Sequence, residues 1–491
     1  MPSYRSRNTI HGCNMSAVSC ALMVNRLMEV GMMAQLPGHS GAAVSEYRNN
    51  AGDVRAVYAD VLASFVGLGY DGMRERWRQA NRVVELDAFS FALDPKEFRP
   101  VPTDWIPRII EMAEWRNIKA GVEQRLRALN AFLLDVYAGA QTVVPDDVVY
   151  SCQYFYPELQ GFRPAKDVFV HIYGIDLVQQ RDGEYVVLED NLRIPSGITY
   201  QLKTMEIARQ MFPEICEGYD IVPYDIRDTY LDLFASLCDN PNPTCALLTD
   251  SKFGSAFFEH RYLSELLDIP LVEGSDLYIG YDGDVWMKTL DGDARVDLIY
   301  RRVEDLEIFV PHLTDAYLNG KVVLVNGMGT SVADDKLVFL WVPDMIRHYL
   351  DEEPILGQAV SYDLDDAASR AYVLENLDKM VLKTRQGYGG LGVYIMPDLA
   401  GNYRTQLTRQ IIENPRAMIA QETIDFTRHV IFDEETGEYD DRYIDLRVYA
   451  VQNGRGEATA FPGGLTRVSQ AGNRVTNNSS GGLCKPTWVV R

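Results

Sequence analysis

The sequence predicts an α/β protein of about three domains. Its 491 residues suffice for about three domains at roughly 150 residues each. Hydrophobic residues make up 47% and Gly plus Pro only 59 residues, which is typical of a globular protein and excludes a disordered or fibrous one. After about residue 150, strand patterns such as 168–178 and 296–302 alternate with helical patterns at 255–267 and 337–350. This alternation indicates an α/β (α+β) architecture.

Residues 1–145 are predicted to be a helical N-terminal region. From Pro107 to Tyr137 apolar residues recur at helical spacing, with Pro107 suited to a first turn and Asp104 as a candidate cap. An apolar run at 15–24 is similar to a secretory signal, but Arg26 follows at once and no cleavage site is convincing. No stretch approaches 18 uninterrupted apolar residues, so we expect no membrane segment.

The net charge and the cysteine content restrict the binding partners and the cellular compartment that we expect. The net charge of −23 repels a phosphate backbone, so we expect no nucleic-acid partner. Seven scattered cysteines without a CxxC pair argue against disulfides or zinc and favour the cytoplasm. Residues 442–491 reverse the sign, with seven Lys/Arg against two Asp/Glu. This segment is therefore where we expect an anion to be held.

The segment 173–197 predicts a hairpin that carries oxygen ligands. An Asp-Gly pair at 182–183 indicates a two-residue type I′ turn, which sets Asp176 opposite Glu189 at a constant index sum of 365. Asn191 lies two residues further along and therefore on the same face. Opposed acids destabilise a sheet, whereas converging oxygens suit Mg²⁺. The sequence thus predicts a magnesium site at Asp176, Glu189 and Asn191.

The surroundings of this hairpin support a buried site. In the predicted register Val178 and Val187 share the face of the acids, which disfavours the alternative of a solvated surface hairpin. Arg193 follows, and then a Pro-Ser-Gly turn in which Ser196 and Gly197 present a hydroxyl and backbone N–H groups. Such a turn could hold a carboxylate or phosphate, although it is also a common loop.

A second constellation lies at 380–396. A strand ends near Lys383, a glycine-rich loop follows, and another strand comes next, which excludes both the Walker A and the Rossmann patterns. A loop of this kind can close over triphosphate oxygens, and a plain glycine-rich hairpin is the alternative. The strand at 418–425 could offer backbone groups to an adenine edge. The loop glycines are Gly387, Gly389, Gly390 and Gly392.

Further charged or small residues are candidates for binding phosphate or closing the site. Lys336 is a candidate second phosphate lysine, with an exposed lysine at a helix start as the alternative. Asp445 and Arg447 share one face of an otherwise apolar strand, so each needs a partner or a ligand. The residues that could complete or close the site are Arg467, Ser480 and Gly481.

Taken together, these elements resemble the ATP-grasp ligases, with the metal motif almost two hundred residues before Lys383 instead of after it. That order is similar to the circularly permuted ATP-grasp group, and most closely to its type 2 proteins, over about residues 100–491. The resemblance rests on segments such as VLEDNLRIPSG, NGMGTSVADDK, IAQETI, DLRVYA, PGGLTRV and NSSGGLCKPTWV. It implies a circularly permuted ATP-grasp fold with an inserted Rossmann-like domain.

The resemblance also implies a domain plan and roles for individual residues. The helical region at 1–145 would precede an ATP-grasp part with the metal motif at 146–245, a Rossmann-like substrate domain at 246–345 and a nucleotide-binding part at 346–491. The metal ligands would be Asp176, Glu189 and Asn191, the phosphate-binding residues Lys336, Lys383 and the 387–392 loop, and the adenine hinge Gln421, Glu422 and Ile424. Arg447 and Arg467 would hold the acyl substrate or the transferring phosphoryl group.

Two departures from the relatives stand out. Glutathionylspermidine synthetases carry an arginine where this chain has Gly174, so that its role falls to Arg193 or Arg447 or is absent. The usual Lys-Asp-Thr-Trp near the C-terminus is Lys-Pro-Thr-Trp at 485–488, which leaves no aspartate for any role there.

The expected activity is ATP-dependent ligation of a carboxylate to an amine through an acylphosphate, with ATP and Mg²⁺ as cofactors. The expected partners are a small-molecule or peptide carboxylate and an amine, with no nucleic acid and no membrane. The oligomeric state stays open, with a homodimer as one candidate. The alternatives are an ATP-grasp phosphotransferase and a nucleotide-binding scaffold for a partner protein.

Overall fold

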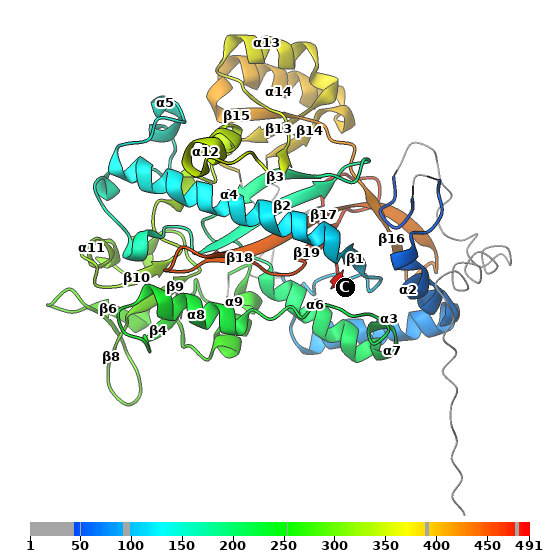
Figure 1. The fold of residues 1–491 in the computed structure, drawn as a ribbon, viewed down its shortest axis with the longest axis horizontal. Helices are drawn as coiled ribbons and strands as arrows, with labels where there is room; N and C mark the ends of the chain where they lie inside the picture. The colour runs from blue at the N-terminus through cyan, green and yellow to red at the C-terminus, as the bar shows by residue number, and fades with distance from the viewer. Residues whose placement is uncertain (1–43, 50, 92–98, 253, 388–391, 477–480) are drawn as a thin grey trace, which may run out of the picture.

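The computed structural model describes residues 44–49, 51–91, 99–252, 254–387, 392–476 and 481–491, and it confirms a mixed α/β architecture (Figure 1). The apolar run at 15–24, Gly389, Gly390 and Ser480 lie outside these residues. Within them no helix is both long and apolar enough to cross a bilayer.

A large sheet occupies the centre of the molecule. Its strand order is β11-β3-β2-β17-β19-β20, and β16 and β18 also pair with β17. The strands are β2 (Ile172–Gln179), β3 (Tyr185–Asn191), β11 (Gly357–Gln358), β16 (Arg428–Phe432), β17 (Tyr439–Gln452), β18 (Ala458–Ala460), β19 (Leu465–Val468) and β20 (Leu483–Lys485). The long helix α4 (Met112–Ala138) crosses one face of this sheet (Figure 1). Ile175 and Leu177 are buried with α4, so Asp176, between them on β2, lies on the opposite face.

A smaller antiparallel sheet stands above the large one (Figure 1). It consists of β12 (Ser361–Asp363), β15 (Met418–Glu422), β13 (Met380–Thr384) and β14 (Val393–Ile395), in that order. Helices α13 (Ala367–Glu375) and α14 (Gly401–Glu413) cover its outer side. Val373, Leu407 and Ile411 of these helices share a core with Met380 and Leu382 of β13, which leaves the inner side of the sheet for the large sheet.

The predicted Rossmann-like segment contains a parallel sheet of order β10-β9-β4-β5. Its strands are β4 (Cys245–Leu248), β5 (Leu271–Val272), β9 (Leu298–Arg301) and β10 (Val323–Val325). The helices in and beside it are α8 (Arg227–Leu237), α9 (Phe257–Leu267), α10 (Leu306–Phe309) and α11 (Leu313–Leu318), and a three-stranded sheet adds β6 (Leu277–Ile279), β7 (Val285–Met287) and β8 (Ala294–Arg295).

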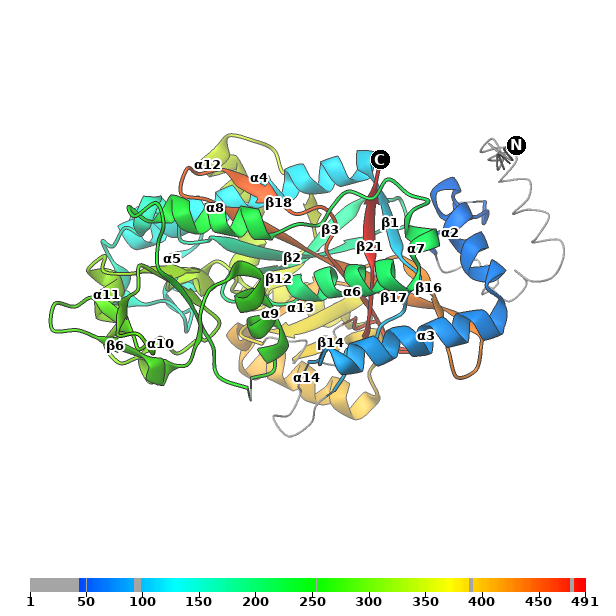
Figure 2. The same ribbon diagram turned by 90° about the horizontal axis from the view of Figure 1, so that it is seen from below.

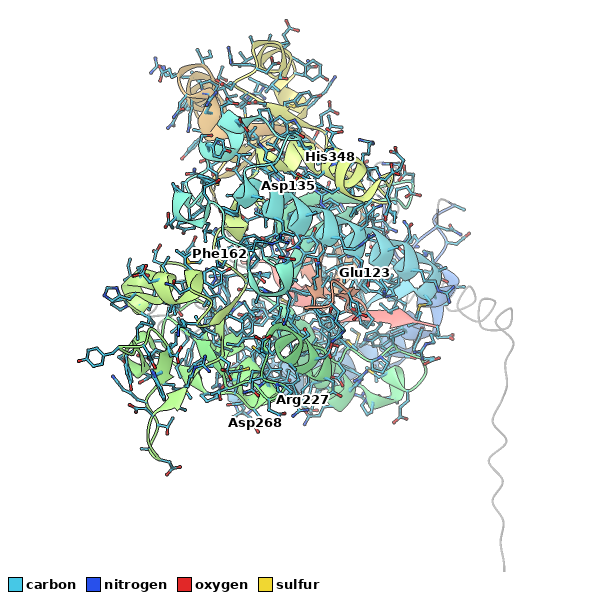
Figure 3. All side chains as sticks on the ribbon, turned by 60° about the vertical axis from the view of Figure 1, so that its left-hand side comes forward. Glu123, Asp135, Phe162, Arg227, Asp268 and His348 are labelled. Atoms are coloured by element: carbon cyan, nitrogen blue, oxygen red, sulfur yellow. The ribbon has the colours of Figure 1, made fainter. Side chains whose placement is uncertain are left out.

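The remaining helices pack around these sheets. They are α2 (Ala56–Gly67), α3 (Gly69–Leu86), α5 (Asp146–Tyr150), α6 (Ile198–Met211), α7 (Pro213–Cys216) and α12 (Val342–Leu350). The short 3₁₀ turns are η2 (Pro157–Leu159), η3 (Ala165–Asp167), η4 (Gly274–Asp276), η5 (Thr330–Val332), η6 (Val338–Trp341), η7 (Leu377–Lys379), η8 (Met396–Asp398) and η9 (Pro415–Ala417). Figure 3 places Glu123 and Asp135 along α4 and His348 on α12, which packs against it.

The predicted start of the helix at Pro107 is wrong. Residues Arg108–Glu111 form a strand, β1, that pairs in parallel with β21 (Thr487–Val490), and the helix begins at Met112 (Figure 2). Asp104 does not cap it, because its carboxylate accepts from the backbone N–H of Ile106 and Phe432 and pairs with Lys485. A distant partner strand therefore overrides the local helical pattern.

Candidate active site

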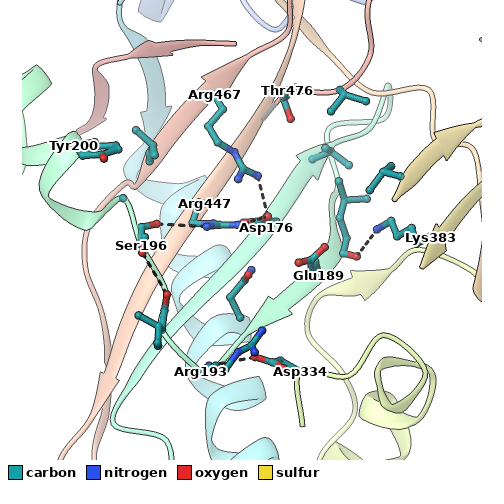
Figure 4. Close-up of a pocket in the computed structure, with 18 of the residues that line it drawn as sticks. Asp176, Glu189, Arg193, Ser196, Tyr200, Asp334, Lys383, Arg447, Arg467 and Thr476 are labelled. Carbon is teal, nitrogen blue, oxygen red and sulfur yellow. Dashed lines mark hydrogen bonds and ion pairs between the residues drawn. The ribbon is translucent and has the colours of Figure 1, made fainter. Parts of the chain in front are cut away.

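A cavity of about 470 Å³ lies where the large sheet, the small sheet and the parallel sheet meet. Most of the predicted site residues that the structure describes line it, although they come from elements far apart in the sequence (Figure 4). They are Asp176, Glu189, Asn191, Arg193, Ser196, Gly197, Lys383, Gln421, Glu422, Ile424, Arg447 and Arg467. Lys336 and Gly387 line a smaller cavity that shares Glu189 and Asn191 with it. Gly392 and Gly481 line neither.

The hairpin β2–β3 brings the three predicted metal ligands onto one face. Asp176 pairs with Glu189, as predicted, and Gly174 pairs with Asn191. The predicted turn is wrong, because Gly183 N–H bonds Gln180 O at 3.0 Å and the loop comprises the three residues 181–183.

A bulge at Leu188 compensates for this one-residue shift. Before the bulge Leu177 pairs with Val187, so Val187 faces the α4 core and not the acids as predicted. Val186, opposite Val178, takes its place. The side of the sheet that carries the acids is thus still partly apolar.

Two arginines hold Asp176. Arg447 Nε and Nη2 contact its two oxygens at 2.6 and 2.7 Å, and Arg467 Nη2 contacts Oδ2 at 2.8 Å (Figure 4). Although burial alone would raise the pKa of Asp176, Arg447 and Arg467 hold it well below its ordinary value. The two arginines therefore favour the ionised form of Asp176.

In the part of the chain that the structure describes, Arg467 has a second carboxylate partner and Arg447 has none. Arg467 Nε donates to Asp445 Oδ1 at 2.8 Å, and Nη2 lies 2.5 Å from Oδ2, where Thr476 also donates. The additional contact of Arg447 is with the carbonyl of Ser196 at 3.4 Å. Asp445, expected to need a partner, has one in Arg467.

Glu189 and Asn191 have the chemistry to hold a hard cation. Among the described residues the Glu189 carboxylate accepts no hydrogen bond, and Oε1 lies 3.7 Å from Lys336 Nζ. The buried amide nitrogen of Asn191 also has no partner there. The ligand that Asn191 could offer a cation is its amide oxygen, which accepts no hydrogen bond among the described residues. Side-chain oxygens with unused capacity at the edge of a cavity fit Mg²⁺. Asp176 fits only if it exchanges a contact with an arginine for the metal.

Two buried lysines face these acids from the other side of the cavity. Lys383 of β13 donates to Leu188 O at 3.1 Å, and burial lowers its pKa to about 8, against the opposing effect of Glu189. Lys336 is buried, so the exposed alternative is excluded; its Nζ donates to Gly387 O at 2.6 Å. Lys383 thus ends at the backbone of β3, and Lys336 ends between Glu189 and the start of the glycine-rich loop.

Comparison with known proteins decides the family. The sequence model named "Circularly permuted ATP-grasp type 2" matches residues 107–469. The chain belongs to this family. An uncharacterized protein of Synechocystis sp. is 39% identical over 80% of this chain and 85% of its own length. A Frankia alni protein named "Putative glutamate--cysteine ligase 2-3" is 35% identical over 93% of this chain but only 55% of its own length.

The structural comparison agrees on the fold. A glutathione synthetase-like effector from Globodera pallida superposes with a TM-score of 0.58 at 13% identity, over 85% of this chain and 96% of that one. The circularly permuted ATP-grasp fold accounts for the two facing sheets, with Asp176, Glu189 and Asn191 on the large sheet and Lys383 on the small one.

In this ATP-grasp chain the Pro-Ser-Gly turn is held by the protein's own carboxylate. Glu259 Oε2 accepts from the backbone N–H of Gly197 at 2.7 Å and of Thr199 at 3.3 Å. Arg302 donates to Ser196 Oγ at 2.6 Å and to Glu259 Oε1 at 2.7 Å. The Gly197 N–H, one of the backbone donors expected to hold a substrate anion, is therefore already occupied. Glu259 and Arg302 thus form a buried ion pair behind this turn.

Arg193 belongs to a different part of the cavity from Arg447. It pairs with Glu304, and its guanidinium lies 4.3 Å from the centre of the Tyr154 ring. Asp334, which sequence reasoning missed, accepts from the backbone N–H groups of Leu192 and Arg193 at 3.2 Å each. Burial raises the pKa of Asp334 to about 6. Its position in a loop gave no periodic signal that could have identified it.

The predicted hinge connects the small sheet to the large one. β15 ends at Glu422, and Thr423 N–H bonds Lys379 O at 2.8 Å as the chain leaves the sheet. Gln421 donates to Ser361 Oγ at 3.1 Å, and Ile424 lies at the cavity wall. A nucleobase at this wall would meet apolar atoms and the edge of the backbone.

Proposed function

We propose that the protein is an ATP-dependent ligase that joins a carboxylate to an amine through an acylphosphate intermediate. The observation that carries the proposal is the single cavity in which Lys383 of the small sheet faces Glu189 and the Arg447–Asp176 pair of the large sheet. Membership of the ATP-grasp family supports ATP as the second substrate. The ligase name of the Frankia relative agrees in reaction class, for a protein of which this chain matches about half.

In the proposed reaction an oxygen of the substrate carboxylate attacks the γ-phosphorus of ATP, and the bond to the β-phosphate oxygen breaks to release ADP. The amine then attacks the acyl carbon, the C–O bond to phosphate breaks, and the amine proton is lost to solvent. The products are an amide, ADP and phosphate.

The residues of this chain would contribute chiefly by positioning and by neutralising charge. Lys383 and Lys336 would bind phosphate oxygens, and the hinge at 421–424 would hold the adenine. Arg447 and Arg467 would hold the carboxylate. Mg²⁺, held by Glu189 and Asn191 with Asp176, would neutralise and orient the phosphates.

ADP release tests the proposal. We expect release that depends on both Mg²⁺ and a carboxylate, measured with a panel of amino acids, short peptides and polyamines, and hydroxamate formation when hydroxylamine replaces the amine. ADP without hydroxamate would indicate phosphotransfer instead.

Two variants sharpen the test. Glu189→Gln should abolish the Mg²⁺-dependent turnover, whereas Lys379→Arg, on an exposed lysine outside the cavity, should leave it unchanged. A protein that binds nucleotide and a partner but releases no ADP with any carboxylate would indicate a scaffold.

A further inference from the structure

The carboxylate site on Arg447 is already occupied, because Asp176 sits on it. Arg447 offers Nε and Nη2, the two donors in the fork that binds a carboxylate in bidentate fashion, and Asp176 accepts from both. The Arg447 side chain is only 16% exposed. A substrate carboxylate therefore cannot take this fork while Asp176 keeps it.

Asp176 has a second possible partner, a cation bound by residues of the paired strand β3. Asp176 stands directly opposite Glu189 and near Asn191, and neither the Glu189 carboxylate nor the Asn191 amide oxygen accepts a hydrogen bond among the described residues. A cation bound by Glu189 and Asn191 would attract the adjacent Asp176 carboxylate. The arginine pair and the metal thus compete for one side chain.

The two arginines differ in what they would lose. Arg467 keeps Asp445, with contacts at 2.8 and 2.5 Å, if Asp176 turns away. Among the described residues Arg447 then keeps only the Ser196 carbonyl at 3.4 Å, a weak neutral contact for a buried guanidinium. Arg447 is therefore the residue that would be left without a carboxylate and would need a new one.

From this asymmetry we infer that Asp176 is an internal substitute for the substrate carboxylate, and that loading of Mg²⁺ and nucleotide moves Asp176 to the metal and unmasks Arg447. The inference rests on the proposed function and adds an order to it: the nucleotide and metal bind first, and the carboxylate binds second. The order would prevent the carboxylate from occupying the site before a phosphoryl donor is present.

Chemical modification of arginine tests this without measuring turnover. The full chain is treated with phenylglyoxal, and the modification rates of Arg447 and Arg467 are read from their peptides by mass spectrometry. We expect Arg447 to react at least tenfold faster with Mg²⁺ and ADP than with ADP and EDTA. Arg467 should change less than twofold, because Asp445 continues to hold it.

Two variants distinguish the contact of Asp176 with Arg447, called the mask below, from metal binding. Asp176→Asn removes the mask, so Arg447 should react rapidly even with EDTA. Glu189→Gln removes a metal ligand and leaves the mask, so Mg²⁺ and ADP should no longer accelerate modification of Arg447. Thermal unfolding of each variant checks that it is folded, and a crystal structure of the wild type with Mg²⁺ and ADP provides the same test if Asp176→Asn does not fold.

The outcomes are decisive and distinguishable from those of the proposed function. Calorimetric titration with Mg²⁺ and ADP comes first. If the nucleotide binds and Arg447 stays protected, or if Asp176 still contacts Arg447 in the crystal of that complex, the inference is overturned and the ligase proposal stands. If no nucleotide binds at all, the proposed function fails, and the inference fails with it.

Discussion

Lys383 is predicted to bind nucleotide phosphates only in its protonated form, and burial weakens that form in the free protein. Its pKa of about 8 follows from burial, opposed by the attraction of Glu189. A bound phosphate would restore the charge. Above pH 8 nucleotide binding must therefore be accompanied by proton uptake at Lys383.

The magnitude follows from the pKa. A lysine with a pKa of about 8 is mostly protonated at pH 7 and about one-tenth protonated at pH 9. The affinity for ADP should therefore fall about tenfold between pH 7 and pH 9. Lys383→Arg keeps its charge across this range and should remove the pH dependence. Lys379→Arg, on an exposed lysine outside the cavity, should keep it.

The assay is calorimetric titration of ADP in two buffers of different ionisation enthalpy. At pH 8 the wild type should take up about half a proton per ADP at this site. Equal proton uptake by the wild type and Lys383→Arg would refute the assignment of Lys383 to the phosphates.

The same burial means that the protonated form of Lys383 destabilises the folded protein. The unfolded chain binds the proton at pH values up to about 10.5 and the folded chain only up to about 8, so stability rises as pH increases from 8 to 10.5. Below pH 8 the full penalty of about 3 kcal/mol applies. Lys383→Met should therefore raise the free energy of unfolding at pH 7 by up to about 3 kcal/mol while weakening ADP binding, measured by urea denaturation and calorimetry. A loss of stability would contradict the burial argument.

Three further predictions concern the frame of the site. Glu259→Gln leaves Arg302 buried without a carboxylate and should cost about 3–5 kcal/mol in urea denaturation, and adding Arg302→Met should recover much of that loss. Gly197→Ala should lower the free energy of unfolding by at least about 2 kcal/mol, because φ is +109° and the new Cβ would lie 2.5 Å from the nearest side-chain atom. Gly67→Ala, with open space around the new Cβ, should not lower it. Burial raises the pKa of the Cys152 thiol, so iodoacetamide at pH 8 should label it only as fast as the protein unfolds, as judged by peptide mapping; rapid labelling of the folded protein would contradict its burial.

Local patterns predicted the parts of the site that depend on local periodicity. The alternation along β2 and β3 placed Asp176 opposite Glu189 although the predicted turn was wrong. The prediction survived because the three-residue loop shifts the register by one and the bulge at Leu188 shifts it back. A composition pattern cannot reveal a bulge, which is why the partner of Val178 was wrong as well.

Contacts between distant segments could not be predicted from the sequence. Arg108–Glu111 fits a helix locally, and only the parallel pairing with β21, almost four hundred residues later, makes it a strand. Likewise the turn-forming residues Pro-Ser-Gly predicted backbone donors that are free to bind a ligand. Whether Glu259 reaches them depends on how α9 packs against α6, which no local signal encodes.

Packing around Gly174 shows what occupies the space where the glutathionylspermidine synthetases carry an arginine. A Cβ on Gly174 would lie 3.0 Å from Pro195 Cβ and 3.8 Å from Arg447 Cδ, so a long side chain there would meet the Pro-Ser-Gly turn and the stem of Arg447. Arg193, the other candidate, is paired with Glu304. Arg447 thus reaches Asp176 across the space that the glycine leaves open. The absence of a side chain at 174 and the bidentate binding of Asp176 by Arg447 are two parts of one arrangement.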